Sequence, residues 1–297
     1  MNLWTDSFLE YLRSERNYSP ATIESYEKDL TAFQDFLKEQ RPAPRWEEIN
    51  ADDVREWVIY MLDEQKFTAS SVNRKLSALR TCYKYLRRMG RVEANPMEKV
   101  VAPKKERPLP YFVREQDMDR LLEMTAEDRT FKGIRDRLVL MLFYETGIRR
   151  AELLSMTNAS VDLAARQIKV TGKRNKQRLI PFGKELEKEL EAYLEARNAI
   201  AESSETSTLI VTEGGMALSE AQVSKIVKDN LAKVTTLKKK SPHVLRHSFA
   251  TAMLNNKADL TSIQKLLGHE SVATTEVYTH VSFEDLKNEY KNAHPRK

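Results

Sequence analysis

The sequence predicts a mainly α-helical protein of two domains, with one small β-hairpin in the second domain. Three observations support this fold class. Apolar residues recur three and four positions apart over long segments, which is the spacing of an amphipathic helix. The chain contains only 8 glycines. Its 297 residues exceed one typical domain and leave each half long enough to bury its own core.

Residues 1–94 are expected to form a domain of four helices. The second of these begins at Ser19-Pro20, because serine is a good N-cap and proline at the first helical position loses no hydrogen bond. The first helix carries an apolar cluster of Phe8, Leu9 and Leu12.

The third and fourth helices are predicted over 52–64 and from Ser70 or Ser71 to Gly90. Glycine commonly ends a helix, since it adopts the left-handed backbone conformation without a Cβ clash. The fourth helix has one apolar stripe, so it can pack in a core and still bind phosphate with its other sides. The basic residues on those sides are Arg74, Arg80, Lys84, Arg87 and Arg88.

Basic residues are segregated along the chain. The formal net charge is +5, but residues 1–69 carry 8 Lys and Arg against 15 Asp and Glu, whereas residues 70–107 carry 11 against 3. A second basic stretch runs from Lys225 to Lys265. Two separate basic zones favour a polyanion partner, namely DNA, over a merely solvated helix face. The expected DNA-binding residues are Arg74, Lys75, Arg80, Lys84, Arg87, Lys104 and Lys105.

Residues 95–110 are expected to link the two domains. Repeated proline disfavours helix and favours an extended path. The basic residues between the prolines indicate that the linker lies along DNA. The prolines are Pro96, Pro103, Pro108 and Pro110.

The second domain is assigned to residues 111–297. Two runs, 167–171 and 177–181, flank a turn and predict a β-hairpin, and 209–211 is a further candidate strand. Helical periodicity is present at 115–124, 132–146, 149–156, 184–200, 219–234, 242–256, 259–267 and 271–279.

Neither a membrane segment nor a secretion signal is expected. No run of 18 apolar residues exists, and the N-terminus lacks a basic start followed by an apolar stretch. The protein is therefore expected to be cytoplasmic. The single cysteine, Cys82, excludes an internal disulfide and a Cys-clustered zinc site, and its helical surroundings predict a buried structural thiol.

Four segments of the second domain carry residues suited to phosphodiester chemistry. Arg149 stands at the start of a predicted helix. His243 and Arg246 are three residues apart, so they face the same way on a helical turn. His269 follows a glycine that ends a helix, and Tyr278 lies nine residues further on. Taken singly, each has a plainer explanation, such as a salt bridge or a core position.

In this order and these local contexts, the four segments resemble the Arg…His-x-x-Arg…His…Tyr signature of the tyrosine recombinases, the phage integrase family. The pairing of Thr-Gly-Ile-Arg at 146–149 with Leu-Gly-His at 267–269 is similar to the Xer subgroup, whose members resolve chromosome dimers. The resemblance covers nearly the whole chain. It implies a C-shaped clamp made of an N-terminal SAM-like core-binding domain and a C-terminal catalytic domain.

The resemblance also implies a role for each residue. Tyr278 is the nucleophile that forms a 3′-phosphotyrosine, while Arg149 and Arg246 neutralise the charge that builds on the non-bridging phosphate oxygens. Arginine suits this task because its planar fork reaches two phosphate oxygens. Glu152 fits a carboxylate that orients Arg149.

The remaining residues of the implied set handle protons and a further hydrogen bond. His269 bonds the same phosphate oxygens. His243 accepts or shuttles the phenol proton, since an unperturbed tyrosine with a pKa of about 10 is a poor nucleophile at neutral pH. Lys173, in the hairpin turn, protonates the departing 5′-oxygen, and Lys169 and Lys176 are its nearby competitors.

No metal ion and no cofactor is expected. The chemical segments are poor in Asp and Glu, which a two-metal nuclease needs, and no glycine-rich phosphate loop is present. The other three histidines are expected to be structural or surface residues: His247, His280 and His294.

The implied activity is site-specific DNA recombination through a Holliday junction, resolving chromosome dimers at a terminus site for segregation at cell division. The implied partners are a short inverted-repeat site in double-stranded DNA, a homo- or hetero-tetramer on two such sites, a second Xer-type recombinase and a cell-division DNA translocase. The alternatives are a phage or transposon integrase, a type IB topoisomerase, and a non-catalytic DNA-binding protein on the same fold.

The tail after Tyr278 carries one more apolar stripe, at Phe283, Leu286 and Tyr290, on a short predicted helix. A helix this short is marginal in isolation and needs a partner surface. It either folds back on its own domain or is exchanged with a neighbouring subunit of a ring. The resemblance favours exchange.

Overall fold

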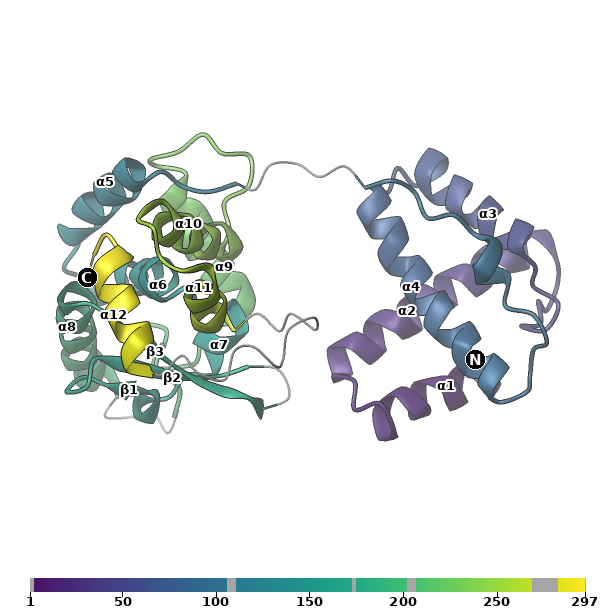
Figure 1. Ribbon diagram of the computed structural model, residues 1–297, viewed down its shortest axis with the longest axis horizontal. Helices are drawn as coiled ribbons and strands as arrows, with labels where there is room; N and C mark the ends of the chain where they lie inside the picture. Colours follow the sequence, from purple (N-terminus) through teal and green to yellow (C-terminus); the bar gives the residue numbers. More distant parts are fainter. Residues whose placement is uncertain (1–2, 106–110, 173–174, 202–206, 269–282, 297) are drawn as a thin grey trace. The chain divides into compact units, whose positions relative to one another are not determined.

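The computed structural model of the chain describes residues 3–105, 111–172, 175–201, 207–268 and 283–296 (Figure 1). The chain divides into two compact units, Met1–Pro108 and Leu109–Lys297. Within the described ranges the structure is mostly helical, with one small three-stranded sheet in the second unit, which confirms the predicted fold class. No helix in these ranges is long and apolar enough to cross a bilayer.

The first unit contains four α-helices in its described part. They are α1 (Leu3–Ser14), α2 (Pro20–Gln40), α3 (Ala51–Ile59) and α4 (Ala69–Arg88), and α3 continues into a π-helical turn, η1 (Tyr60–Glu64). Their apolar faces enclose one core, in which Phe33, Trp57 and Tyr83 are almost fully buried. Cys82 lies in the same core, as predicted, and burial raises the pKa of its thiol.

Side-chain caps define where these helices begin. Ser19 caps α2, and Pro20 occupies its first turn, as predicted. The start of α4 differs from the prediction, because Thr68 rather than Ser70 or Ser71 is the N-cap. Thr68 Oγ1 accepts a hydrogen bond from the backbone N–H of Ser71 at 3.3 Å, so the serine lies inside the first turn.

The first part of the predicted linker packs onto the first unit. It includes a 3-10 helix, η2 (Pro96–Lys99), because proline is tolerated at the first position of a helix. Met97 and Val100 are buried in the core of the unit. Asn73 Nδ2 on α4 donates a hydrogen bond to Pro103 O at 2.8 Å, which fixes the chain further on. The expectation of an extended linker from residue 95 onward is therefore wrong for this part.

The second unit surrounds one buried helix. α6 contacts α5, α8, α9 and α10 and lies at the centre of the unit (Figure 1). It is buried on all sides from Leu138 to Phe143, and this explains why the segment is apolar all round. The helices of the described part are α5 (Glu115–Ala126), α6 (Phe131–Thr146), α7 (Arg150–Ser155), η3 (Asn158–Ser160), α8 (Lys184–Ala201), α9 (Glu220–Leu231), α10 (Pro242–Asn255), α11 (Leu260–Leu267) and α12 (Phe283–Ala293).

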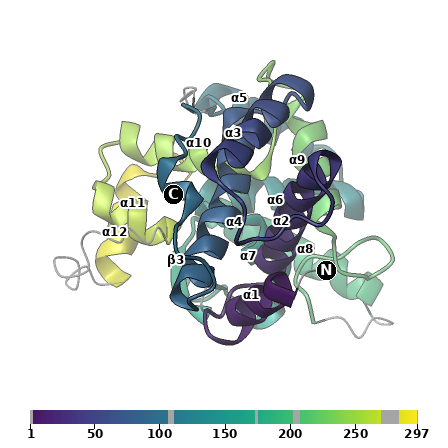
Figure 2. The ribbon, with the colours of Figure 1, turned by 90° about the vertical axis from the view of Figure 1, so that its right-hand side faces the viewer.

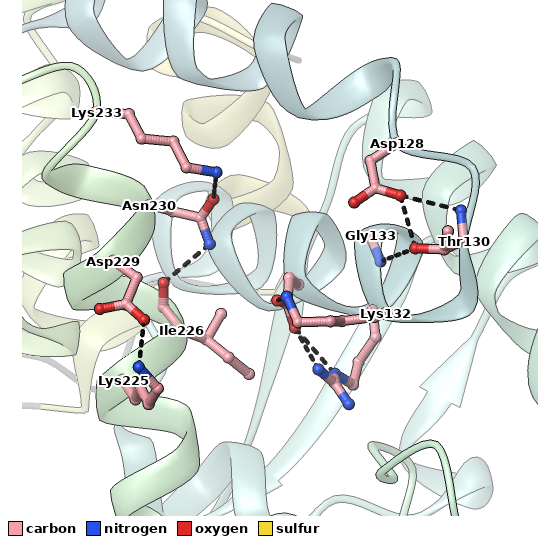
Figure 3. Close-up of polar contacts among 11 residues, drawn as sticks. Asp128, Thr130, Lys132, Gly133, Lys225, Ile226, Asp229, Asn230 and Lys233 are labelled. Carbon is pink, nitrogen blue, oxygen red and sulfur yellow. Dashed lines mark hydrogen bonds and ion pairs between the residues drawn. The ribbon is translucent and has the colours of Figure 1, made fainter.

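A polar cap holds the start of α6. Asp128 Oδ1 accepts hydrogen bonds from Thr130 N at 3.1 Å and from the Thr130 hydroxyl at 2.6 Å, and Thr130 Oγ1 accepts from Gly133 N at 3.1 Å (Figure 3). A Cβ on Gly133 would lie 2.2 Å from Asp128 Cγ, so a side chain would displace the cap. The cap thereby fixes the helix whose other end carries the candidate active site.

The hairpin lies where the sequence predicts it. β2 (Gln167–Thr171) and β3 (Gln177–Pro181) pair antiparallel, and a short strand that the sequence does not predict, β1 (Val161–Asp162), pairs with β2. The candidate strand at 209–211 is not a regular strand, since Val211 makes only an isolated bridge to Ala217.

The C-terminal helix is folded back on its own domain. α12 contacts α10, α11 and β3 (Figure 1 and Figure 2). Tyr290 and His294 are each 1% exposed, and their rings stack with centroids 4.8 Å apart. In the single chain, Leu286 and Tyr290 of the apolar stripe thus pack against the core of the same domain. The single chain has the fold-back arrangement, and exchange with a neighbouring subunit stays a prediction.

Candidate active site

Arg149 stands at the junction between α6 and α7. α6 ends at Gly147, which has a φ of 59°, and a Cβ there would lie 2.6 Å from the ring of Phe249, so only glycine fits. Ile148 is fully buried and anchors the turn. Arg149 follows in an extended conformation as the N-cap of α7, with 32% of its side chain exposed. A rigid backbone therefore presents a partly exposed guanidinium group.

α10 carries Arg246 into the same region. The residue is 7% exposed, its Nη1 donates to Gly147 O, and its Nη2 donates to Leu267 O at 2.6 Å. Burial, and then the positive charge of Arg149, lower the pKa of Arg246 to about 10. Arg246 therefore stays protonated at neutral pH and provides a second fixed positive charge.

His243 is an exposed side chain in the first turn of α10. Partial desolvation, followed by the positive charges of Arg246 and Arg150, lowers its pKa below the usual value of 6.5. The neutral imidazole therefore predominates at neutral pH. A neutral imidazole can accept a proton, as the implied role of His243 requires.

Three arginines converge on the last turn of α11. The helix ends at Gly268, which has a φ of 62°. The last carbonyls of a helix have no partner within it and carry the negative end of the helix dipole, so this turn suits guanidinium groups. Consecutive carbonyls accept from different side chains: Leu266 O from Arg178 Nε at 2.7 Å, Leu267 O from Arg246 Nη2 at 2.6 Å, and Gly268 O from Arg149 Nη2 at 2.7 Å.

One buried carboxylate, that of Glu152, joins two of these arginines. Its Oε1 accepts from Arg149 Nη1 at 2.8 Å and from Arg178 Nη1 at 2.7 Å. Its Oε2 accepts from Arg149 N at 2.7 Å and from Arg178 Nη2 at 2.9 Å. Burial alone would raise the pKa of Glu152, but the hydrogen bonds from Arg178 and Arg149 outweigh it, so the pKa is lowered and the group is ionised. Glu152 thus makes the contact expected of a carboxylate that orients Arg149.

The predicted catalytic residues fall into two groups. The structure brings three together, because Arg149 and Arg246 bond adjacent carbonyls of α11 and His243 lies one turn from Arg246 on α10. The others lie outside the described residues: Lys173, His269 and Tyr278. The competing hairpin lysines are both exposed, namely Lys169 and Lys176.

Sequence reasoning missed Arg178. In the hairpin, Arg178 pairs with Val170, which is 2% exposed. Residues directly opposite each other in an antiparallel pair share one face of the sheet. A charged residue opposite a buried valine was therefore the available signal that Arg178 points inward.

Two of the predicted DNA-binding residues are tied to a buried carboxylate. Asp29 on α2 is 1% exposed, and it accepts hydrogen bonds from Arg74 at 2.6 and 3.0 Å and from Lys75 Nζ at 3.0 Å. A buried carboxylate is costly unless it is paired. Arg74 and Lys75 therefore hold α4 against α2, which is a structural task in addition to the predicted binding of DNA.

Most of the other predicted DNA-binding residues are exposed, as Arg74 is. Arg87 forms an ion pair with Glu98 at 2.7 Å, and both side chains are more than half exposed. Such surface pairs contribute little to stability, so a phosphate group can replace the carboxylate. Arg80 is partly buried, and three residues are exposed: Lys84, Lys104 and Lys105.

Two of the remaining histidines are placed as predicted. His247 is exposed on α10, and His294 is buried after α12. His280 lies outside the described residues. Arg150, next to the candidate site, donates to Ser224 Oγ at 2.9 Å and pairs with Glu220, so it ties α7 to α9.

Family models match both units of this chain. The phage integrase family model matches residues 111–285, and the model of the phage integrase N-terminal SAM-like domain matches residues 5–90. The chain belongs to the phage integrase family. The match to the first model includes the segments that carry Arg149, His243 and Arg246.

Full-length relatives define the branch of the phage integrase family. The tyrosine recombinase XerC of Staphylococcus aureus is 40% identical, over 100% of this chain and 98% of that relative. The tyrosine recombinase XerC of Chlorobaculum parvum is 38% identical, over 98% of this chain and 94% of that relative. These relatives place the chain among the Xer-type tyrosine recombinases, which are site-specific DNA recombinases.

Solved structures of recombinases share the fold. A crystal structure of XerA recombinase is 28% identical, covers 99% of each chain, and has a TM-score of 0.50. The XerH site-specific recombinase bound to palindromic difH substrate, in a post-cleavage complex, is 21% identical. That comparison covers 96% of this chain and 83% of XerH, with a TM-score of 0.71.

Proposed function

We propose that this Xer-type recombinase cuts and rejoins DNA through a covalent 3′-phosphotyrosine formed by Tyr278, without a metal ion. The observation that supports the proposal most is the pair of guanidinium groups, of Arg149 and Arg246, held on adjacent carbonyls of α11. A phosphodiester under attack gains negative charge on its non-bridging oxygens. Two positive charges fixed in advance stabilise that charge without reorganisation at the moment of reaction.

The proposed cleavage step exchanges one phosphoester bond for another. The Tyr278 oxygen attacks the scissile phosphorus, the bond from phosphorus to the 5′-oxygen breaks, and the phenol proton passes to His243. Lys173 donates a proton to the departing 5′-oxygen, and His269 donates a hydrogen bond to the phosphate. Rejoining is the reverse step, in which a 5′-hydroxyl of the exchanged strand attacks the phosphotyrosine and Tyr278 leaves.

The proposed role in the cell is resolution of chromosome dimers at a terminus site, through a Holliday junction. The support is that the full-length relatives are XerC proteins. The DNA partner is supported by the XerH complex with its palindromic substrate. The proposed assembly is a tetramer on two short inverted-repeat sites in the cytoplasm, formed with a second Xer-type recombinase and activated by a cell-division DNA translocase.

The target site can be captured directly. The full-length protein is incubated with a library of genomic fragments in which nicked duplexes release a short piece on cleavage and so trap the covalent complex. We expect sequencing of the trapped DNA to give one short inverted repeat near the replication terminus. Trapped DNA that maps instead to the end of a mobile element would contradict the chromosomal role and favour an integrase.

A further inference from the structure

Arg178 on β3 lies beside the active site but has no part in the proposed chemistry. Only 14% of its side chain is exposed. Its Nε donates to Leu266 O at 2.7 Å, and Nη1 and Nη2 grip the Glu152 carboxylate at 2.7 and 2.9 Å. All three nitrogens are therefore engaged within the protein. A guanidinium group held in this way does not serve as a fork for a DNA phosphate.

Arg178 limits how many hydrogen bonds Glu152 can accept from the guanidinium group of Arg149. Each carboxylate oxygen of Glu152 accepts two hydrogen bonds, which saturates the group. Arg178 donates two of these four bonds and the backbone N–H of Arg149 donates a third, so the Arg149 guanidinium donates only one, from Nη1. N–H groups of Arg149 thus remain for a substrate phosphate. Without Arg178, Glu152 would be free to bind Arg149 with both oxygens and would compete with the phosphate.

Arg178 also fixes the turn to which the phosphate-binding arginines are attached. Arg178 bonds Leu266 O. The next two carbonyls in the chain, Leu267 O and Gly268 O, accept from Arg246 and Arg149. A Cβ on Gly268 would lie 3.0 Å from Arg178 Nη1, so the guanidinium packs directly against the turn. The hairpin thereby braces the end of α11.

We propose that Arg178 is a positioning residue for DNA cleavage. It acts through Glu152 and the end of α11, and it holds Arg149 and Arg246 in the orientation that receives the scissile phosphate. The inference rests on the proposed function. DNA affinity comes mostly from contacts with phosphate groups along the whole DNA site, so the affinity should change little when Arg178 is removed. The cleavage step should slow.

The test is Arg178→Ala in the full-length protein. Formation of the covalent complex on a nicked suicide duplex is followed in a single turnover at saturating protein, and the Kd for the uncleaved duplex is measured separately. We expect the rate constant to fall by about tenfold to a hundredfold, as for a misplaced catalytic group, while the Kd changes by less than about twofold.

A double-mutant cycle with Glu152→Gln separates positioning from a general loss of structure. If Arg178 acts through Glu152, the Glu152→Gln change should slow cleavage less in Arg178→Ala than in the wild type, by about threefold or more. Arg166→Ala is the matched control, because it breaks an arginine–glutamate pair of the same sheet region, to Glu187 at 2.7 Å. It should cleave at the wild-type rate.

Three outcomes would overturn the inference: an unchanged rate in Arg178→Ala, additive effects of the two substitutions, or a loss of DNA affinity that accounts for the slower cleavage. Should Arg178→Ala fail to fold, Arg178→Lys decides, since it keeps the charge without the fork. We expect it to fold and to cleave slowly, and a wild-type rate would overturn the inference. A wild-type protein that forms no covalent complex would instead remove the proposed function itself.

Discussion

The hydrogen bonds of His294 identify its protonation state. The backbone N–H of Arg296 donates to Nδ1 at 3.1 Å, so Nδ1 carries no proton. Nε2 faces the carbonyl of Tyr144 at 3.3 Å and must carry the proton, because a carbonyl oxygen only accepts. Burial lowers the pKa of His294 to about 4. The ring is therefore neutral in the folded protein at neutral pH.

The second unit should lose stability as the pH falls below the pKa of an unfolded histidine, about 6.5. From there down to about 4 the unfolded chain binds a proton at this residue and the folded chain does not, so the free energy of unfolding falls with pH. The full effect of this group is on the order of 3 kcal/mol. Thermal unfolding of the wild type and of His294→Gln, from neutral pH down to about pH 4, measures it.

The wild type must be compared with His294→Gln because another buried group changes the free energy of unfolding in the opposite direction as the pH falls. Burial raises the pKa of Glu145 well above its usual range, so protonation of Glu145 favours the folded state as the pH falls. The wild type should lose more stability than His294→Gln over the same pH range. An identical loss in both proteins would show that His294 is not the group responsible.

Residues with local signatures are the ones that the sequence predicts. Arg149, His243 and Arg246 lie in short motifs, and the structure brings them together. Arg178 was missed because its partners, Glu152 and Leu266, lie 26 and 88 residues away in the chain. The bond from Arg74 to Asp29 likewise spans 45 residues. Periodicity reports only on near neighbours, so contacts of this range need the fold.

At the scale of elements, too, the sequence predicts what a local pattern determines and misses what depends on distant segments. The β2–β3 hairpin is predicted with its observed bounds, because both strands and the turn lie in one continuous segment. β1 has only two residues and was missed, since its pairing with β2 leaves no alternation to detect. The apolar stripe of α12 is recognisable in the sequence, but its partner surface is not, because α10, α11 and β3 meet there only in three dimensions.

Removal of α12 tests whether the fold-back arrangement matters. Truncation after Ser282 would remove Tyr290, Ala293 and His294, which are buried in the second unit. Loss of an aromatic core side chain costs about 3–5 kcal/mol, a large part of the stability of a typical domain. We therefore expect the truncated protein to have an unfolded second unit, as measured by circular dichroism and thermal unfolding. A folded protein with an unchanged Tm that fails only in synapsis would support tail exchange instead.

The basic face of α4 should provide DNA affinity without sequence preference. Arg80→Gln with Lys84→Gln should reduce the slope of log Kd against log salt concentration by about 0.9 for each phosphate group that the variant no longer binds. Lys28→Gln, an exposed lysine on α2 paired with Glu24, is the matched control and should leave the slope unchanged. An unchanged slope in the double variant would mean that this face does not bind DNA.

Arg74 should behave differently from its neighbours on α4. Arg74→Gln removes two hydrogen bonds from the buried carboxylate of Asp29, which leaves that group partly unpaired. An unpaired buried charge is strongly destabilising. We expect a lower Tm for Arg74→Gln than for Arg80→Gln, and equal Tm values would show that the Asp29 pair is not structural.

At the scale of the whole molecule, we propose that DNA affinity and cleavage chemistry depend on residues of different units. The first unit carries the exposed basic residues of α4, and the second carries the arginines fixed on α11. Substitutions in the first should therefore change binding and its salt dependence, while substitutions at the α11 turn should change the rate of cleavage. The central claim is that cleavage requires one nucleophile, Tyr278, and no metal ion.

Covalent trapping with Tyr278→Phe tests that claim most directly. A labelled, nicked suicide duplex is incubated with each protein in EDTA, and protein-linked DNA is separated under denaturing conditions. The wild type should form the covalent complex in EDTA, whereas Tyr278→Phe should bind the duplex with the same Kd and form none, because only the attacking oxygen is removed. A covalent complex in Tyr278→Phe, or a strict requirement of the wild type for Mg²⁺, would contradict the account.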